Sequence, residues 1–382
     1  MKYLIRIVLA LLVTTQASAN PTAFSLVPSA PNLNAKAYLL IDYHSDQVLA
    51  ESNADARIEP ASLTKMMTAY ATFYELKSGT IKMEDTAKVS LNAWKTAQGT
   101  STMFLRERQE VGIKDLLYGL IIQSGNDASI VLAEHIAGSE EAFSSLMNEH
   151  ARMLGMTGTN FVNATGLPNK DHYTTARDLA TLAKAIIRDF PEHYHIHGIK
   201  KFSFNGIDQY NRNNLLWRDR FVDGLKTGHT DSAGYCLVAS AVRKNMRLIS
   251  VVTGTSNENA RAIESQKLLR YGYRFFSTYH IYDADTELYK MRVWKGSKEE
   301  VPLGINQPLY VTIPRGQYKK LKASLDVNKD IEAPVTKGGQ YGSVNVTLAG
   351  NQLLQRPLVA LEDISEGSIW EQTKDGVMQM FQ

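Results

Sequence analysis

The sequence contains a single cysteine, Cys236, among 382 residues. An intramolecular disulfide is therefore excluded, and no cysteine framework holds the chain together. Cys236 lies in the apolar, strand-like run 233–239, where no neighbour in the sequence indicates a lowered thiol pKa. We therefore expect a small buried side chain rather than a catalytic thiol.

The sequence also has little net charge. Lysine and arginine total 42 and the acidic residues 39, a formal charge of +3. Two of the cations, Lys2 and Arg6, precede the first apolar run, so a chain without this leader would carry +1. This balance does not predict a nucleic-acid partner, which normally requires a strongly basic surface.

The apolar run near the N-terminus, 7–13, is too short to span a bilayer comfortably. It follows Lys2 and Arg6 and precedes Ala17-Ser18-Ala19, a pattern typical of a cleavable export signal. We predict a signal peptide over 1–19 and a mature protein that works outside the cytoplasm. An uncleaved N-terminal anchor is the alternative.

Length and periodicity predict two domains, since a domain typically takes about 150 residues. Residues 20–35 contain three prolines and are expected to form an N-terminal arm. Strand-like runs at both ends of a helical middle predict a catalytic domain at 36–282, with one sheet flanked by helices. Short strand-like runs then predict a small all-β domain at 283–362.

The tail, 363–382, is predicted to form an amphipathic helix, with Ile369, Trp370, Thr373, Val377, Met380 and Phe381 on one face. Such a face suits the surface of a membrane. Only Lys374 offers a basic contact, against five acidic residues from Glu362 to Asp375. Packing on the β domain and disorder therefore stay open as alternatives.

The chemistry centres on Ser62 and Lys65, at the start of an apolar helical run over 62–76. Residues three apart lie on the same side of a helix, with Cβ atoms about 5–6 Å apart, so the amine can reach the hydroxyl. The positive N-terminal end of the helix favours negative charge developing beside Ser62. An isolated Ser-x-x-Lys is nevertheless common by chance.

Two further motifs make the Ser-x-x-Lys motif specific. Ser124-Gly125-Asn126 falls between two helical runs, and Lys226-Thr227-Gly228 precedes an apolar strand. Alone, Ser124-Gly125-Asn126 would suggest a turn that ends a helix. The order Ser-x-x-Lys, Ser-x-Asn, Lys-Thr-Gly is the signature of penicillin-binding proteins and related β-lactamases.

From about 35 to 361 the chain resembles the low-molecular-mass penicillin-binding proteins that are D-alanyl-D-alanine carboxypeptidases. The segments 211–217, 222–230 and 312–316 also resemble that family. The resemblance implies the α/β fold shared with serine β-lactamases, an antiparallel sheet flanked by helices, followed by a smaller all-β domain. It also implies a periplasmic enzyme without a cofactor, peripheral on the outer face of the inner membrane if its tail binds there.

The resemblance also implies roles for the motif residues. Ser62 attacks the bond between the last two D-alanines of a peptidoglycan stem peptide, and Lys65 is its base. Burial, the helix N-terminus and Lys226 would each favour a neutral Lys65 amine. Ser124 relays a proton to the leaving amine. Asn126 holds the substrate backbone and orients Lys65.

The third motif is expected to start an edge strand beside the cleft. Lys226 and Thr227 would face the substrate's terminal carboxylate, and Gly228 would allow close backbone approach. In the family the oxyanion hole takes the backbone N–H groups that correspond here to Ser62 and His229. Arg261 resembles a second carboxylate contact, although its helical position also suits a surface arginine.

Other functions remain open at this point. His193, His195 and His197 alternate and could share one face of a strand as metal ligands, but a solvated polar face is favoured, and His172 is expected in a loop. β-Lactams would acylate Ser62 and be released slowly, because 161–175 contains no glutamate to serve as the deacylating base of a class A β-lactamase. A serine β-lactamase and a noncatalytic cell-wall scaffold are the alternatives.

Overall fold

A computed structural model of the chain describes residues 27–328 and 330–379. The predicted signal peptide, the first part of the predicted N-terminal arm, and Met380 and Phe381 lie outside these residues. Within the described ranges, no helix combines the length and the apolar character that crossing a membrane requires.

The first part of the chain is organised on a five-stranded antiparallel sheet in the order β2-β1-β9-β8-β7. All six residues of β1 (Ala37–Asp42) are buried, as expected for a strand with neighbours on both sides. It pairs with β2 (Val48–Ser52) and with β9 (Met246–Thr255), so N-terminal and distant strands complete one sheet as predicted. β8 (Gly234–Arg243) and β9 form a hairpin, and β7 (Val222–Thr230) is the edge strand.

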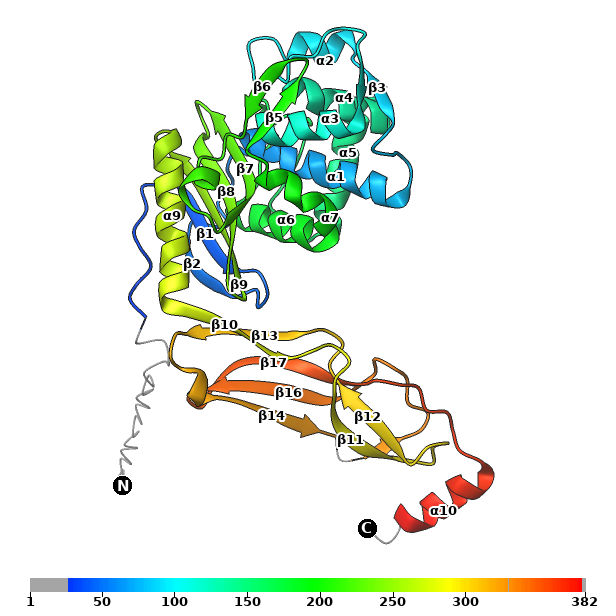
Figure 1. Cartoon of the computed structure of the whole chain (residues 1–382). Helices are drawn as coiled ribbons and strands as arrows, with labels where there is room; N and C mark the ends of the chain where they lie inside the picture. The colour runs from blue at the N-terminus through cyan, green and yellow to red at the C-terminus, as the bar shows by residue number, and fades with distance from the viewer. Residues whose placement is uncertain (1–26, 329, 380–382) are drawn as a thin grey trace, which may run out of the picture.

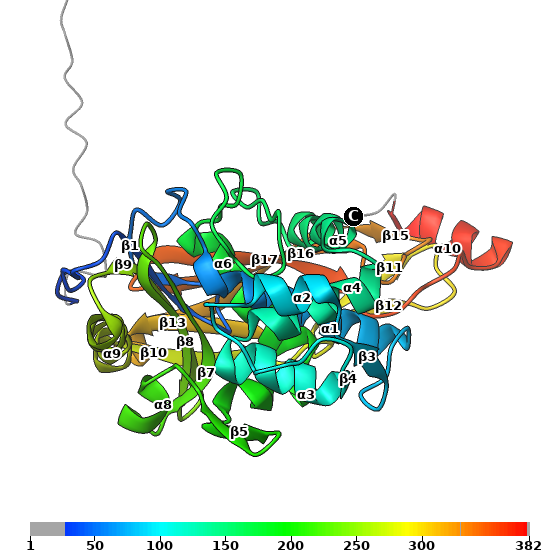
Figure 2. The ribbon, with the colours of Figure 1, turned by 90° about the horizontal axis from the view of Figure 1, so that it is seen from above.

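Helices cover both faces of this sheet (Figures 1 and 2). One face packs against α9 (Glu258–Phe275) and the other against α6 (Ala176–Asp189). Beyond α6, the helix α1 (Lys65–Ser78) is enclosed by α4 (Asn126–Ala137) and α5 (Glu140–Met153). The fold class predicted from the sequence, an antiparallel sheet flanked by helices, is confirmed.

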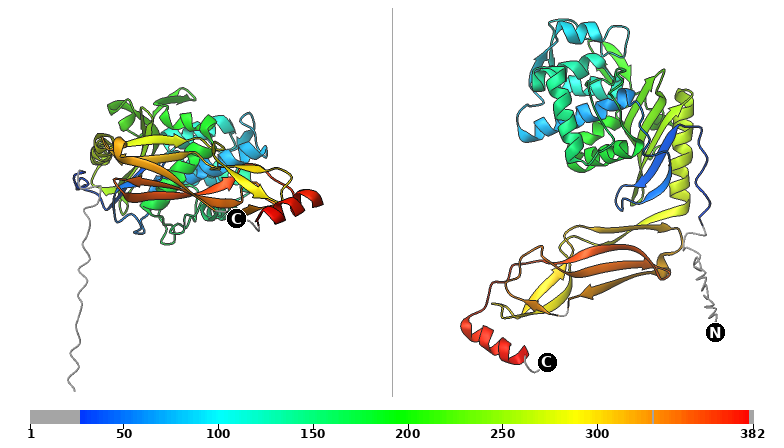
Figure 3. Two further views of the ribbon diagram at one scale, coloured as in Figure 1. Left: turned by 90° about the horizontal axis from the view of Figure 1, so that it is seen from below. Right: turned by 180° about the vertical axis from the view of Figure 1, so that it is seen from behind.

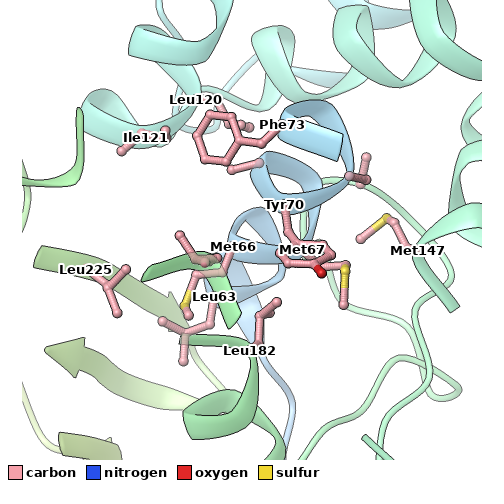
Figure 4. Close-up of a cluster of buried hydrophobic side chains, with 14 of the residues drawn as sticks. Leu63, Met66, Met67, Tyr70, Phe73, Leu120, Ile121, Met147, Leu182 and Leu225 are labelled. Atoms are coloured by element: carbon pink, nitrogen blue, oxygen red, sulfur yellow. The ribbon is translucent and has the colours of Figure 1, made fainter. Parts of the chain in front are cut away.

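The helix α1 occupies the centre of the larger hydrophobic core. Leu63, Met66, Met67 and Phe73 have no exposed surface, so the predicted burial of this helix is confirmed. Figure 4 shows these side chains among Leu225 of β7, Leu182 of α6 and Met147 of α5. Because the first nine residues of α1 are all buried, its first turn is held rigidly at the edge of the sheet.

Short elements complete this part of the structure. The loop-rich region 78–110 contains β3 (Thr86–Lys88) and α2 (Leu91–Thr96), and β3 pairs with β4 (Glu110–Gly112). The helix α3 (Ile113–Tyr118) continues into a π-helical turn, Gly119–Gln123. The strand β5 (Lys201–Phe204) pairs with β6 (Ile207–Tyr210) in a separate hairpin. The short helix α7 (Pro191–Tyr194) precedes β5, and α8 (Leu215–Arg218) follows β6.

The C-terminal part is rich in β-strands, as predicted (Figure 3). β10 (Phe276–Tyr282) pairs with β13 (Leu309–Pro314), although the sequence places β10 in the first domain. The boundary predicted after Tyr282 therefore separates β10 from its pairing partner. A six-stranded sheet has the order β14 (Leu321–Val327), β16 (Gln340–Leu348), β17 (Asn351–Ala360), β12 (Glu300–Gly304), β11 (Glu287–Trp294), β15 (Ile331–Glu332).

The tail forms the helix α10 (Ile369–Gln379), at the end of the C-terminal part remote from α9 (Figure 1). Asp375 attaches it to β11 and the following turn through Arg292 at 3.2 Å and the backbone N–H of Lys295 at 2.7 Å. Ile369 and Trp370 are 85% and 78% exposed. The helix is therefore held on one side and presents apolar side chains on another.

Candidate active site

Ser62 lies in a 3₁₀ helix, Ala61–Thr64, that leads directly into α1. The sequence predicts the first turn of an α-helix here, and the tighter 3₁₀ turn is the observed form. Ala61 and Leu63 on either side are buried, whereas Ser62 is partly exposed and lines a cavity. The predicted contact with Lys65 is present, with 3.1 Å between Ser62 Oγ and Lys65 Nζ.

Lys65 is almost fully buried, yet no carboxylate accepts a hydrogen bond from it. Its amine instead lies 2.6 Å from Asn126 Oδ1 and 2.6 Å from the carbonyl oxygen of Thr165. Burial and, to a smaller extent, the positive charge of Arg212 together lower the pKa of Lys65 to about 7. A substantial fraction of the amine is therefore neutral near pH 7.

Ser124 is the second serine hydroxyl of the site, and its side chain is buried. It has a left-handed backbone conformation, with φ of 67°, at the end of the π-helical turn before α4. Lys226 Nζ donates a hydrogen bond of 2.8 Å to Ser124 Oγ. Burial holds the pKa of Lys226 well below its usual value, and the charges of Lys65, Arg212 and Arg261 act in the same direction.

The Lys-Thr-Gly motif lies in the middle of the edge strand β7. The prediction that it starts the strand is wrong, because pairing with β8 begins at Val222. The middle position sets Gly228 against the Ser62 turn: a Cβ there would lie 3.0 Å from the Pro60 carbonyl oxygen and 3.3 Å from the Leu63 backbone nitrogen. The glycine thus allows the strand to approach the backbone beside Ser62.

A cavity of about 160 Å³ opens between β7, α9 and the Ser62 turn. Arg261 is buried on its α9 side, with Glu258 at 3.5 Å and the carbonyl oxygen of Gly228 also at 3.5 Å. The ring of His229 stacks on Tyr235 with 3.9 Å between centroids. The cavity wall is formed by Ser62, Ser101, Ser124, Arg212, Thr227, Gly228, His229, Tyr235, Glu258 and Arg261.

The structure therefore brings together every residue that the three motifs nominated. Ser62, Ser124, Thr227, Gly228, His229 and Arg261 line one cavity, and hydrogen bonds connect Lys65, Asn126 and Lys226 to it. Arg261 is not the ordinary surface arginine of the alternative interpretation, since its side chain is only 4% exposed.

Sequence reasoning missed several contributors. Arg212 falls in a segment that resembles the family, but nothing local assigned it to the cavity. Asp127 follows Asn126 directly and accepts hydrogen bonds from the backbone N–H groups of Met103 and Leu105, at 3.0–3.1 Å. These bonds hold the segment that includes Ser101 beside the cavity. No sequence signal could have paired Asp127 with a loop more than 20 residues away.

The loop 161–168 closes the back of the site. Gly166, at φ +82°, lies against the Ser62 turn, and a Cβ there would be 1.8 Å from the Ala61 carbonyl oxygen. His172 is buried rather than solvated. Its Nδ1 accepts from the Val162 backbone N–H at 3.1 Å, and its Nε2 lies 2.7 Å from Thr64 Oγ1. Burial lowers the pKa of His172 to about 4, so the ring is neutral near pH 7 and connects the loop to Thr64 through its two hydrogen bonds.

The alternating histidines do not form a strand. His193 belongs to α7, and His195 and His197 to a following 3₁₀ helix. The favoured interpretation, a solvated polar face, is wrong for His197, which is fully buried with a pKa lowered to about 3 by burial. Among the described residues no group of three potential metal ligands is found. Cys236 is buried as predicted.

Comparison with known families matches two models to this chain. The model described as D-alanyl-D-alanine carboxypeptidase, of peptidase family S11, matches residues 25–257. The model described as the C-terminal domain of penicillin-binding protein 5 matches residues 276–366. The second match begins at the first residue of β10, in agreement with the pairing of that strand.

Individual relatives agree with these models. The chain is 47% identical over 369 residues to D-alanyl-D-alanine carboxypeptidase DacC of Escherichia coli strain K12, covering 94% of this chain and 92% of that protein. The structure superimposes on penicillin-binding protein 5 of Haemophilus influenzae with a TM-score of 0.86 and 42% identity, over 89% of this chain and all of that one. Penicillin-binding protein D2 of Listeria monocytogenes, solved with cefotaxime bound, has a TM-score of 0.60 and 28% identity, over 64% of this chain and all of that one. The chain therefore belongs to the D-alanyl-D-alanine carboxypeptidases, a family of serine-type hydrolases.

Proposed function

We propose that this carboxypeptidase uses Ser62 as its nucleophile and removes the terminal D-alanine of peptidoglycan stem pentapeptides through an acyl-enzyme. The observation that carries this proposal is the hydrogen bond of 3.1 Å between Ser62 Oγ and the buried amine of Lys65. A serine hydroxyl becomes an effective nucleophile when a neighbouring base takes its proton. Lys65 is such a base, because burial has lowered its pKa to about 7.

The proton then needs a route to the leaving D-alanine amine, and Ser124 supplies it. Lys226 donates to Ser124 Oγ, so the Ser124 proton is free to point elsewhere. Asn126 keeps the Lys65 amine in place through its Oδ1, while its own Nδ2 donates to Thr100 Oγ1 at 2.8 Å. The Asn126 amide is thereby fixed in one orientation.

The substrate carboxylate would bind where the positive charges meet. Arg212, Arg261 and Thr227 line the cavity, and the Lys226 amine lies behind it. The backbone N–H groups of Ser62 and His229 are proposed as the oxyanion hole. Each aimed donor of this type typically contributes about 3–4 kcal/mol to the transition state.

β-Lactams are proposed as inhibitors that acylate the same serine. Penicillin-binding protein D2 of Listeria monocytogenes has been solved with cefotaxime and with ampicillin bound. Glu140 of α5 accepts a hydrogen bond of 3.0 Å from the Ala164 backbone N–H in the loop 161–175. It is thereby occupied with the loop backbone, which supports slow release of a β-lactam adduct.

Replacement of Ser62 tests this function, and the cavity contains its own control. Ser62→Ala should abolish D-alanine release from a stem pentapeptide and covalent labelling by fluorescent penicillin. Ser101→Ala, on the same cavity wall, should retain labelling. Persistent D-alanine release by the Ser62→Ala variant would refute the mechanism.

We further propose that the mature chain is exported to the periplasm and touches the inner membrane through α10. The exposed side chains Ile369, Trp370 and Val377 support this contact, and Asp375 fixes the helix so that they face outward. Trp370→Ser combined with Ile369→Ser should reduce flotation with phosphatidylglycerol vesicles. Unchanged flotation would contradict the proposal.

A further inference from the structure

A second, larger cavity lies away from the catalytic one, at the junction of the two parts of the chain. Its volume is about 1010 Å³, and its wall comes from the end of α8 and the segment after it, the β8–β9 turn, the C-terminal half of α9 and the start of β10. Figure 1 shows α9 leading directly into β10 at this junction. We call this cavity the basic cleft, after its charges: Arg218, Arg220, Arg243, Lys244, Arg270, Arg274 and Arg315.

Against these seven cations the cleft wall has one carboxylate, Asp219, a net charge of +6. The whole chain has a formal charge of only +3, so all other residues together carry −3. The concentration of positive charge is therefore local and does not follow from a generally basic composition.

The cations of the cleft have no carboxylate partners in the structure. Nearby acids are already engaged, Asp223 with Arg247 at 2.8 Å and Glu264 with Lys267 at 2.8 Å. Among the described residues, no ion pair within 4.0 Å involves any of the seven. Residues 1–26, 329 and 380–382 contain no aspartate or glutamate that could supply a partner.

One of the seven has an evident structural role. The guanidinium of Arg315 donates to the carbonyl oxygens of Tyr273 and Phe276 at the C-terminal end of α9. By contrast, Arg220 and Arg243 both lie over the ring of Phe221, at 5.0 and 5.2 Å. Two like charges held on one ring without a counter-ion repel each other, and an anion in the cleft would relieve that repulsion.

The cleft shares two elements with the active site. Arg261, on the wall of the catalytic cavity, and Arg270, on the wall of the cleft, both belong to α9. Nine residues of helix place them about 14 Å apart along its axis. Arg212 of the catalytic cavity and Arg218 of the cleft likewise lie six residues apart in one segment.

We propose that the basic cleft binds the carboxylate groups of a second stem peptide on the same peptidoglycan strand while the first occupies the active site. This inference rests on the proposed function and extends it, since it assigns polymeric peptidoglycan rather than a free peptide as the preferred substrate. An uncrosslinked strand repeats its anionic peptides, and two separate groups of cations, at the active site and at the cleft, suit such a polymer.

A membrane fits the cleft less well. The cleft is recessed between the two parts of the chain, whereas a flat bilayer reaches protruding surfaces. The exposed apolar side chains of α10 lie at the opposite end of the C-terminal sheet (Figures 1 and 3). A membrane contact through α10 therefore does not require the cleft.

The test compares two substrates in three forms of the full-length chain. The cleft variant is Arg218→Gln/Arg243→Gln/Arg270→Gln, with one exposed cation from each of α8, the β8–β9 hairpin and α9. The matched control is Arg152→Gln/Lys322→Gln/Arg356→Gln, which removes three exposed cations elsewhere. D-alanine release is measured from a soluble stem pentapeptide and from uncrosslinked strands that carry it.

We expect the KM for strands to rise on the order of tenfold in the cleft variant, as the loss of three exposed ion pairs would give. Its kcat/KM for the soluble pentapeptide should stay unchanged, and the control should match the wild type on both substrates. Added salt should weaken strand binding by the wild type more than by the cleft variant, because exposed charges are screened.

An unchanged KM for strands in the cleft variant would overturn the inference. So would loss of binding to phosphatidylglycerol vesicles with strand binding intact, since that result would assign the cleft to a membrane. If the wild type released D-alanine from neither substrate, the proposed function would fail instead. Co-sedimentation with strands would then still decide whether the cleft binds them.

Discussion

The pH dependence of acylation offers a quantitative test of the Lys65 environment. Ser62 can be activated only by the neutral amine, so the acylation rate should follow the neutral fraction of Lys65. With a pKa of about 7, that fraction is about 9% at pH 6, 50% at pH 7 and 91% at pH 8. An unperturbed lysine, at about 10.4, would be less than about 1% neutral at pH 8.

The two cases predict different curves. With the lowered pKa of Lys65, the second-order rate constant for acylation by fluorescent penicillin should rise about tenfold between pH 6 and pH 8 and then level off. With an ordinary lysine it would rise about a hundredfold over the same interval and continue to rise. Stopped-flow labelling from about pH 5.5 to 9.5 separates these curves.

The His229→Gln variant is the control for this experiment. It removes the imidazole ring from the cavity wall. His172 titrates below the measured range, with its pKa lowered to about 4. A plateau that survives in His229→Gln excludes the His229 side chain as its source. A rate that climbs through pH 9 without a plateau would refute the proposed role of burial.

Three further predictions concern the surroundings of Lys65. Arg212→Gln should move the inflection of the same profile to higher pH, because the positive charge of Arg212 lowers the Lys65 pKa; an unchanged inflection would contradict this. Gly166→Ala should destabilise the fold by more than about 3 kcal/mol in urea unfolding, because its Cβ would meet the Ala61 carbonyl oxygen at 1.8 Å. Gly338→Ala is its control, with φ of +81° and no atom within 4 Å, and it should cost only the backbone strain of about 1–2 kcal/mol; equal losses would refute the clash. Asp127→Asn should cost about 1–3 kcal/mol and slow penicillin labelling, since it weakens the bonds that hold Met103 and Leu105; full labelling speed would show that this loop is not needed.

The sequence predicts elements whose signal is local. The helix α1 follows from helical periodicity, and it forms close to the predicted run 62–76. Tertiary pairing has no such signal. Neither the separation of β5 from the main sheet nor the pairing of β10 with β13 can be derived from their residues. The division into domains at 36–282 and 283–362 accordingly stays a prediction.

The site shows the same limit. Motif order predicts that Ser62, Ser124 and Lys226 lie close together. Lys226 and Ser124 are indeed joined by a hydrogen bond although they are 102 residues apart in the sequence. The Thr165 carbonyl that accepts a hydrogen bond from Lys65 is a backbone group, so no residue type in the sequence indicates this contact. Arg212 lowers the Lys65 pKa through space, which only a folded chain can show.

The two lysines of the site have different roles because they have different neighbours. Lys65 donates to the Asn126 amide oxygen and the Thr165 carbonyl, whereas Lys226 donates to Ser124 Oγ and the Thr227 carbonyl. Burial and the charges of Lys65, Arg212 and Arg261 lower the pKa of Lys226, so the site disfavours a second ammonium group. A substrate carboxylate beside Thr227 would supply the missing negative charge and favour protonation of Lys226, the lysine on the same strand. The bound substrate would thus charge the lysine that recognises it, while Lys65 remains the amine that activates Ser62.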